Sequence, residues 1–140
     1  MKKVLGFLFA IILFTSCSKQ DNFMPQTQAE TGTPLFYRDA YLAVTSFTAN
    51  AAGASSIKLD FSTLYEKNIS KIELLSGTTP NTLCVIYSTD INTNSSQLKN
   101  YNYIESNPKS STMYYLIRYE LNNGDWGFTD ILKYQAGGGK

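Results

Sequence analysis

Strict alternation of apolar and polar residues, interrupted by turn-forming clusters, is the feature that most restricts how this chain can fold. In residues 57–62 (IKLDFS), Ile57, Leu59 and Phe61 share one face of an extended strand, because successive side chains in a strand point to opposite faces. No segment after residue 34 sustains the 3.6-residue period of an amphipathic helix. The ten tyrosines and eight phenylalanines belong to residue types enriched in strands. The pattern predicts an all-β domain.

Turn signals divide this domain into short strands. They stand at residues 50–53, 76–80, 92–95, 107–108 and 122–124, and Asn123-Gly124 between two alternating runs predicts a tight hairpin joining the last two strands. In the final strand Trp126 and Phe128 share one phase and Ile131 falls on the other, so we expect a β-bulge near Asp130. About seven short strands with frequent turns predict a single antiparallel β-sandwich.

The first 16 residues have the features of an export leader. Met1, Lys2 and Lys3 precede an apolar run at residues 4–14 (VLGFLFAIILF), which is shorter than the roughly 20 residues that a membrane-spanning helix needs. Small residues at 15 and 16 stand directly before Cys17, as in the cleavage site of bacterial lipoproteins. We therefore expect residues 1–16 to be a lipoprotein signal peptide and Cys17 to be lipidated. The alternative is an ordinary secretory signal followed by an incidental cysteine.

The rest of the chain divides into three parts. Residues 17–34 contain the lipidated cysteine and a polar segment that Pro25 and Pro34 interrupt, and we expect this segment to be a flexible tether. The β-sandwich domain is expected at residues 35–135, and residues 136–140 form a Gly-rich tail. A lipid anchor implies a place in the bacterial cell envelope, on the outer membrane and with surface exposure as one option.

The composition argues against several functional classes. The chain contains no histidine, which removes the commonest general base and the commonest zinc ligand, and we expect no catalytic site, metal or cofactor. Its acidic residues stand at outward strand phases or in turns, where we expect solvated charges. Nucleic acid is not expected as a partner, because the chain has no basic run and its formal net charge is +1.

Several motifs resemble the fibronectin type III-like modules of exported Bacteroidetes proteins. Residues 46–49 (SFTA) match the first strand of such modules, residues 59–63 (LDFST) the second, and residues 72–74 (IEL) the third. Residues 114–118 (YYLIR) match the penultimate strand, and the likeness extends over residues 42–134. The resemblance implies a fibronectin type III/immunoglobulin-like sandwich, in which Tyr115 at the start of the penultimate strand would act as a corner clamp through its hydroxyl.

These observations favour binding over chemistry. We expect a non-catalytic envelope lipoprotein that acts as a protein-interaction or adhesion module, with the membrane bound through the lipid anchor and an envelope protein or polysaccharide as partner. One alternative is an accessory carbohydrate-binding lipoprotein that stacks exposed aromatic side chains on sugar rings, and another is a fimbrial subunit. The candidate ligand-binding residues are Tyr119, Trp126 and Phe128, although aromatic residues of a small sandwich also serve to fill its core.

Overall fold

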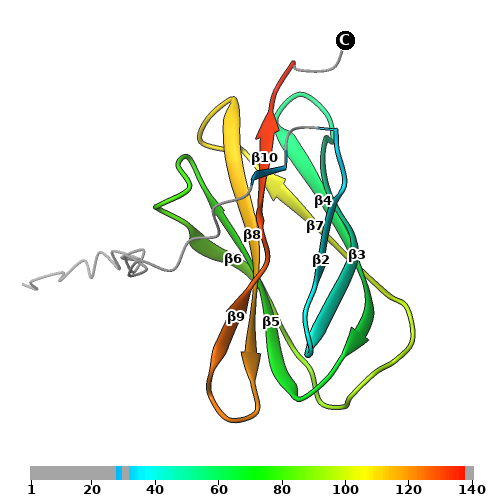
Figure 1. Ribbon diagram of the computed structural model, residues 1–140. Helices are drawn as coiled ribbons and strands as arrows, with labels where there is room; N and C mark the ends of the chain where they lie inside the picture. The colour runs from blue at the N-terminus through cyan, green and yellow to red at the C-terminus, as the bar shows by residue number, and fades with distance from the viewer. Residues whose placement is uncertain (1–27, 30–31, 138–140) are drawn as a thin grey trace, which may run out of the picture.

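The computed structural model describes residues 28–29 and 32–137, and these form two stacked β-sheets (Figure 1). Cys17, the leader and most of the predicted tether lie outside the described residues. The strands are β1 (Gln28–Ala29), β2 (Leu35–Arg38), β3 (Leu42–Ala51), β4 (Ser56–Glu66), β5 (Ile69–Gly77), β6 (Cys84–Asp90), β7 (Lys99–Ser106), β8 (Thr112–Leu121), β9 (Trp126–Phe128) and β10 (Ile131–Gln135).

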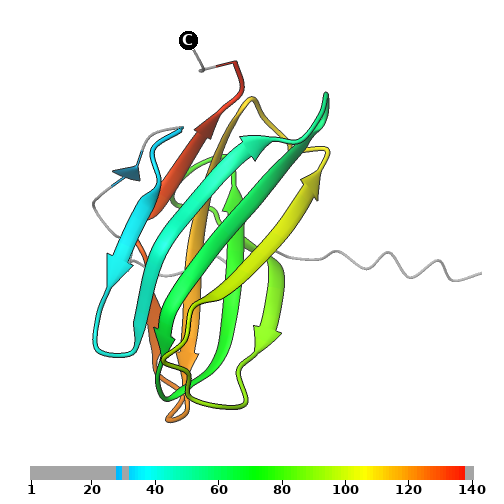
Figure 2. The same ribbon diagram turned by 90° about the vertical axis from the view of Figure 1, so that its right-hand side faces the viewer.

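The two sheets have different strand orders. The first, sheet A, has the order β1-β10-β8-β5-β6, with β9 also paired to β8. The second, sheet B, has the order β2-β3-β4-β7, and Figure 2 shows these four strands side by side. All pairs are antiparallel except that of β1 with β10. The prediction of an all-β antiparallel sandwich is confirmed.

The core consists of the side chains that the alternation placed on the inward faces. Ile57, Leu59 and Phe61 of β4 are each at most 2 % exposed. Phe61 packs edge-on against Phe47, with ring centroids 6.1 Å apart, and stacks on Tyr101 at 4.6 Å. Burial of each such side chain stabilises the fold by about 1.5–3 kcal/mol, so the apolar phase of each strand determines which face it presents to the other sheet.

The last strand is interrupted where its hydrophobic phase changes. β9 ends at Phe128 and β10 begins at Ile131, and both side chains pack in the same outer cluster although they are three positions apart. Thr129 fills the gap: its N–H donates to the Ile117 carbonyl at 2.9 Å, and its Oγ1 accepts the Ile117 N–H at 3.1 Å. A side-chain oxygen thus replaces a backbone carbonyl at this position, and the predicted bulge near Asp130 is confirmed.

The predicted hairpin is also present between β8 and β9. Gly124 has φ +89°, a conformation that favours glycine, and its N–H donates to the Leu121 carbonyl at 2.9 Å. Asn123 bonds Asp125 within the turn. The hairpin places Trp126 opposite Glu120 and Phe128 opposite Arg118.

Candidate functional site

The three aromatic residues predicted to bind ligand lie on two different faces of sheet A. Trp126 and Phe128 of β9 point outward, whereas Tyr119, paired with Gly127 between them, points inward. Tyr119 is only 2 % exposed, so its ring presents almost no surface on which a ligand could stack. Phe128 is half-buried against an outer cluster that includes Leu116 and Ile131, and only Trp126 is well exposed, at 43 %.

Tyr119 instead ties the two sheets together. Its hydroxyl donates to the Asp39 carboxylate and lies 3.3 Å from the Tyr37 hydroxyl. Asp39 stands between β2 and β3, and its other carboxylate oxygen accepts the N–H groups of Tyr41 and Leu42 at 2.7 Å each. Burial, with contributions from Asp39 and Tyr37, raises the pKa of Tyr119. The hydroxyl therefore stays protonated and structural.

Gly127 makes this contact possible. A Cβ at position 127 would lie 2.0 Å from Cζ of the Tyr119 ring and 2.1 Å from its hydroxyl oxygen. Real side chains do not approach so closely, so only glycine lets the Tyr119 ring pass over β9. The glycine in the Trp126-Gly127-Phe128 sequence thus explains why the two outward aromatic residues flank a buried tyrosine.

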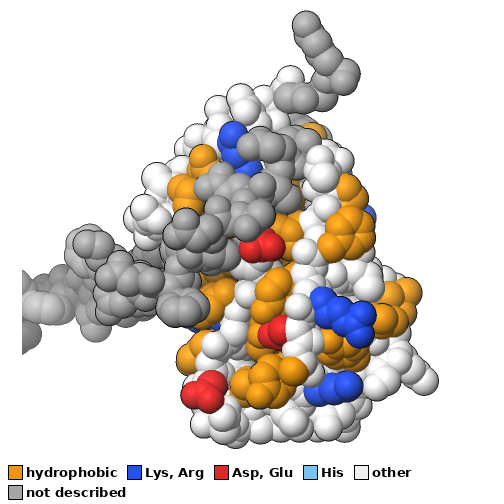
Figure 3. Space-filling model, viewed as in Figure 1, with side chains coloured by type: hydrophobic (Ala, Val, Ile, Leu, Met, Phe, Trp, Pro, Cys, Tyr) orange, Lys and Arg blue, Asp and Glu red, His pale blue; other side chains and the backbone are white. Residues whose placement is uncertain are grey.

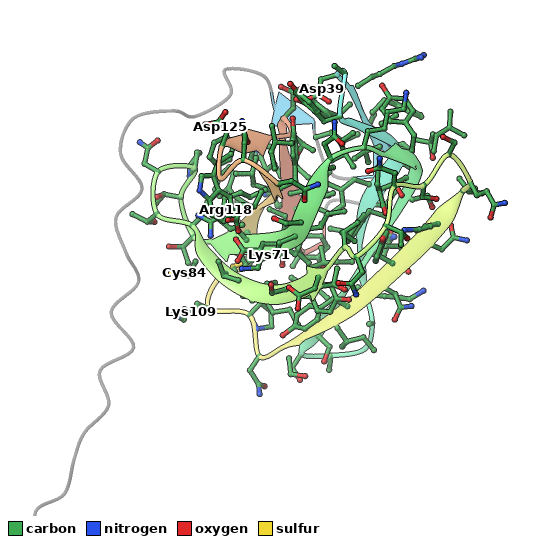
Figure 4. The ribbon with its side chains drawn as sticks, turned by 90° about the horizontal axis from the view of Figure 1, so that it is seen from below. Asp39, Lys71, Cys84, Lys109, Arg118 and Asp125 are labelled. Carbon is green, nitrogen blue, oxygen red and sulfur yellow. The ribbon has the colours of Figure 1, made fainter. Side chains whose placement is uncertain are left out.

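The Arg118 guanidinium packs against the Trp126 ring. Its guanidinium carbon lies 4.4 Å from the centroid of the Trp126 ring, and its Nε donates to Glu73 Oε2 at 2.7 Å. A second ion pair on the same face joins Lys71 Nζ to Glu120 Oε2 at 3.5 Å, and Figure 4 shows Lys71 and Arg118 on one side of the sandwich. The Arg118–Glu73 pair holds the guanidinium under the indole ring, which fixes Trp126 as a single exposed platform.

Glu66 and Glu73 are buried and Glu105 is half-buried, contrary to the prediction of solvated acids. Glu66 is fully buried and accepts hydrogen bonds from Thr63 at 2.7 Å and Tyr101 at 2.6 Å, together with an ion pair from Lys99. Glu105 of β7 accepts the Tyr115 hydroxyl at 2.6 Å and the Ser76 hydroxyl at 2.8 Å, both from sheet A. The positions of these acids along the strands did not predict their burial. Hydroxyl groups provide the hydrogen bonds that a buried carboxylate needs, so these carboxylates can lie inside the sandwich.

Tyr115 acts as the hydroxyl clamp that the sequence resemblance implied, although its acceptor is a carboxylate. It is fully buried in β8 and reaches across the core to Glu105. Burial and the Glu105 carboxylate raise the pKa of Tyr115. Burial and the Glu66 carboxylate raise the pKa of Tyr101 in the same way. Both carboxylates accept hydrogen bonds that stabilise the sandwich, and Glu105 also lines a cavity of about 260 Å³ together with Lys109 and Cys84.

The outer face of sheet B carries a hollow that the sequence analysis did not identify. Its volume is about 400 Å³, and its floor contains Ala43, Val44 and Thr45. Phe36 of β2 and Leu64 of β4 form its sides, at 68 % and 45 % exposed. Both are apolar residues at outward strand phases, and this departure from alternation was the available signal.

One positively charged side chain, that of Arg38, reaches the hollow. Arg38 lines it, and the Arg38 guanidinium carbon lies 5.7 Å from the centroid of the Tyr65 ring. Lys67 Nζ lies 4.8 Å from the same centroid. Figure 3 shows that hydrophobic side chains also reach the surface on the side seen in Figure 1.

Comparison with known proteins gives no relative: no protein-family model, curated protein or solved structure matches this chain. Residues 28–29 and 32–137 contain no helix long and apolar enough to cross a membrane. In the same part of the chain, no group of three or more acidic or cysteine side chains is arranged to hold a metal ion.

Proposed function

We propose that this chain is an envelope lipoprotein whose β-sandwich is a non-catalytic protein-interaction or adhesion module. The hollow on sheet B carries the proposal. Phe36 and Leu64 are exposed beside a concave floor, and burial of each against a partner would contribute about 1.5–3 kcal/mol. Exposed apolar side chains gathered at a concavity mark interaction surfaces more often than scattered ones do.

Photo-crosslinking in intact cells tests this proposal. A crosslinker placed at Thr45, on the floor of the hollow, should capture one envelope protein reproducibly. Phe36→Ser and Leu64→Ser should each abolish the capture. Ile104→Ser is the matched control, because Ile104 is an exposed apolar residue of the same sheet, at 55 %, that does not line the hollow. Capture that survives both hollow variants would assign the interaction to another surface.

Carbohydrate binding is the second candidate, and the exposure of Trp126 favours it. A fixed indole ring with an exposed surface can stack on a sugar ring, although neither Tyr119 nor Phe128 adds a second platform. Retardation on polysaccharide affinity gels should disappear in Trp126→Ala and persist in Phe36→Ser. The reverse result favours the hollow. A fimbrial subunit remains a third alternative, and self-assembly of the purified unlipidated chain into fibres would support it.

The order β10-β8-β5-β6 opposite β2-β3-β4-β7 supports the proposal of a fibronectin type III-like module. Such sandwiches serve many tasks, so the strand order itself does not select a function. Protease digestion of intact cells, compared with lysed cells, distinguishes a surface location from a periplasmic one. Digestion before lysis would support adhesion, and protection would support a partner within the envelope.

The state of the two cysteines tests the anchor. The chain has two cysteines, and the structure gives Cys84 as disulfide-bonded. Mass spectrometry of the envelope protein should find diacylglycerol on Cys17. A mature protein whose first residue is not Cys17, or whose Cys17 lacks lipid, would refute lipid anchoring.

A further inference from the structure

A cavity of about 260 Å³ lies where the edge strands of the two sheets face each other. β6 is the last strand of sheet A and β7 is the last strand of sheet B. Tyr87 of β6 contacts Tyr103 of β7, with ring centroids 5.7 Å apart. The cavity lies next to this contact, between the start of β6 and the end of β7. Sites for drug-sized ligands have volumes of about 300–1,000 Å³, so this cavity suits a smaller molecule.

Glu105 gives one wall of the cavity a fixed negative charge. Its carboxylate accepts the Ser76 hydroxyl at 2.8 Å and the Tyr115 hydroxyl at 2.6 Å. Both donors are neutral, so they hold the group in position without cancelling its charge. Each carboxylate oxygen can accept a second hydrogen bond, and the half-buried Glu105 lines the cavity. The carboxylate can therefore receive a charged donor from a ligand.

Lys109 brings the opposite charge to the same cavity. It is exposed and belongs to the connection between β7 and β8, four residues after Glu105. Figure 4 shows Lys109 on the same side of the sandwich as Cys84, which also lines the cavity. No ion pair within the described part of the chain includes Glu105 or Lys109. The cavity thus presents one carboxylate and one ammonium group that are not joined to each other.

The remaining walls are apolar or are held by an ordered turn. Ile86 is half-buried and Met113 is fully buried, and both line the cavity. In the turn between β5 and β6, the hydroxyl oxygens of Thr79 and Thr82 lie 2.7 Å apart. Gly77 packs closely against this turn, because a Cβ at position 77 would lie 2.1 Å from the Thr82 carbonyl oxygen. The shape of this wall is therefore set before any ligand binds.

The two charges restrict the class of ligand. A ligand that carries only ammonium groups would be repelled by Lys109, and one that carries only carboxylates would be repelled by Glu105. A sugar ring usually stacks on an aromatic side chain, and no aromatic ring among the described residues lines this cavity. A small zwitterion with an apolar group matches both charges and the apolar walls.

We propose that this cavity binds a free α-amino acid with an apolar side chain. The ammonium group of the ligand donates to Glu105, its carboxylate accepts from Lys109, and its side chain packs on Ile86 and Met113. This binding site goes beyond the interaction role proposed for sheet B. It depends neither on the hollow nor on the lipid anchor.

Calorimetric titration of the purified full chain with three probes tests the proposal. L-leucine carries both charges, isoamylamine lacks the carboxylate, and 4-methylpentanoate lacks the ammonium group. We expect leucine to bind tightest. Isoamylamine should bind about two- to fivefold more weakly, because Lys109 is exposed, and 4-methylpentanoate about tenfold or more weakly, because it loses the half-buried Glu105 as acceptor. Equal affinity for leucine and 4-methylpentanoate, no binding of any probe, or binding of D-glucose instead would overturn the proposal.

Two variants assign the charges to their residues. Glu105→Gln should abolish the binding of leucine and isoamylamine, with circular dichroism to check the fold. Lys109→Gln changes an exposed side chain and should lower the affinity for leucine only, so that leucine and isoamylamine bind equally. Lys58→Gln is the matched control, because Lys58 is an exposed lysine of β4 that does not line the cavity. A ratio of the two affinities that is unchanged in Lys109→Gln would refute the proposed binding mode.

Discussion

Replacement of Tyr115 by phenylalanine isolates the contribution of one hydroxyl that joins the two sheets. The ring is fully buried in β8, and its hydroxyl donates to Glu105 Oε2 at 2.6 Å across the core. Tyr115→Phe keeps the aromatic volume and removes only this bond, so no large cavity forms. Glu105 retains the Ser76 hydroxyl at 2.8 Å on its other oxygen.

The expected loss follows from the charge on the acceptor. A hydrogen bond to an ionised group contributes about 1.5–3 kcal/mol, and Glu105 is half-buried, so water replaces the lost donor only in part. We expect Tyr115→Phe to lower the free energy of unfolding by about 2 kcal/mol. In a domain of this size that loss lowers Tm by about 10 °C. Urea titration monitored by circular dichroism measures the same quantity through the midpoint.

Tyr114→Phe is the matched control for this experiment. Tyr114 is the preceding residue of the same strand, and it packs on the outer cluster of sheet A. Among the described residues its hydroxyl bonds no carboxylate, so we expect a change within about 0.5 kcal/mol. If Tyr115→Phe changes stability no more than Tyr114→Phe does, the bond to Glu105 does not stabilise the fold and the reasoning is wrong.

Three further predictions concern the same core. Burial and carboxylate neighbours raise the pKa values of Tyr101, Tyr115 and Tyr119 above that of an unfolded tyrosine, about 10. The free energy of unfolding should therefore be fully present below pH 10 and fall as the pH rises above it. Urea midpoints that stay constant to pH 11.5 would contradict this. Gly127→Ala should displace the Tyr119 ring and lower the free energy of unfolding by about 1–3 kcal/mol. An unchanged Tm would show that the backbone of β9 can shift without loss of stability. Thr129→Val should lower stability by about 1–3 kcal/mol because the Ile117 N–H loses its acceptor, whereas Thr129→Ser keeps the hydroxyl and should recover most of it; equal losses in the two variants would exclude the hydrogen bond as the cause.

Local patterns predicted much of the fold correctly. The alternation at Ile57, Leu59 and Phe61 identified their buried face because side-chain direction in a strand has a period of two, whatever the rest of the chain does. The phase change between Phe128 and Ile131 located the bulge for the same reason. Asn123-Gly124 located the hairpin because few other residue pairs adopt that turn without strain.

The candidate site was harder to predict, because exposure depends on the partner surface. Tyr119 and Trp126 are both aromatic residues of one hairpin, yet one faces the core and the other the solvent. The register between β8 and β9 determines which of the two side chains faces the core. Glu66 and Glu105 were expected in solvent, since nothing local to either residue shows that Tyr101 and Tyr115 will meet them in space.

The sequence by itself determined that the chain is an all-β sandwich, where its turns fall and which residues of most strands face inward, because these properties arise from neighbours along the chain. It also gave the observations on which the export and anchoring proposals rest. Only the tertiary structure decided which carboxylates are buried, which aromatic residues remain exposed, and that Phe36 and Leu64 flank one hollow. Those properties depend on contacts between strands distant in sequence, and the free energy of burying a polar or apolar group is set by what lies opposite it.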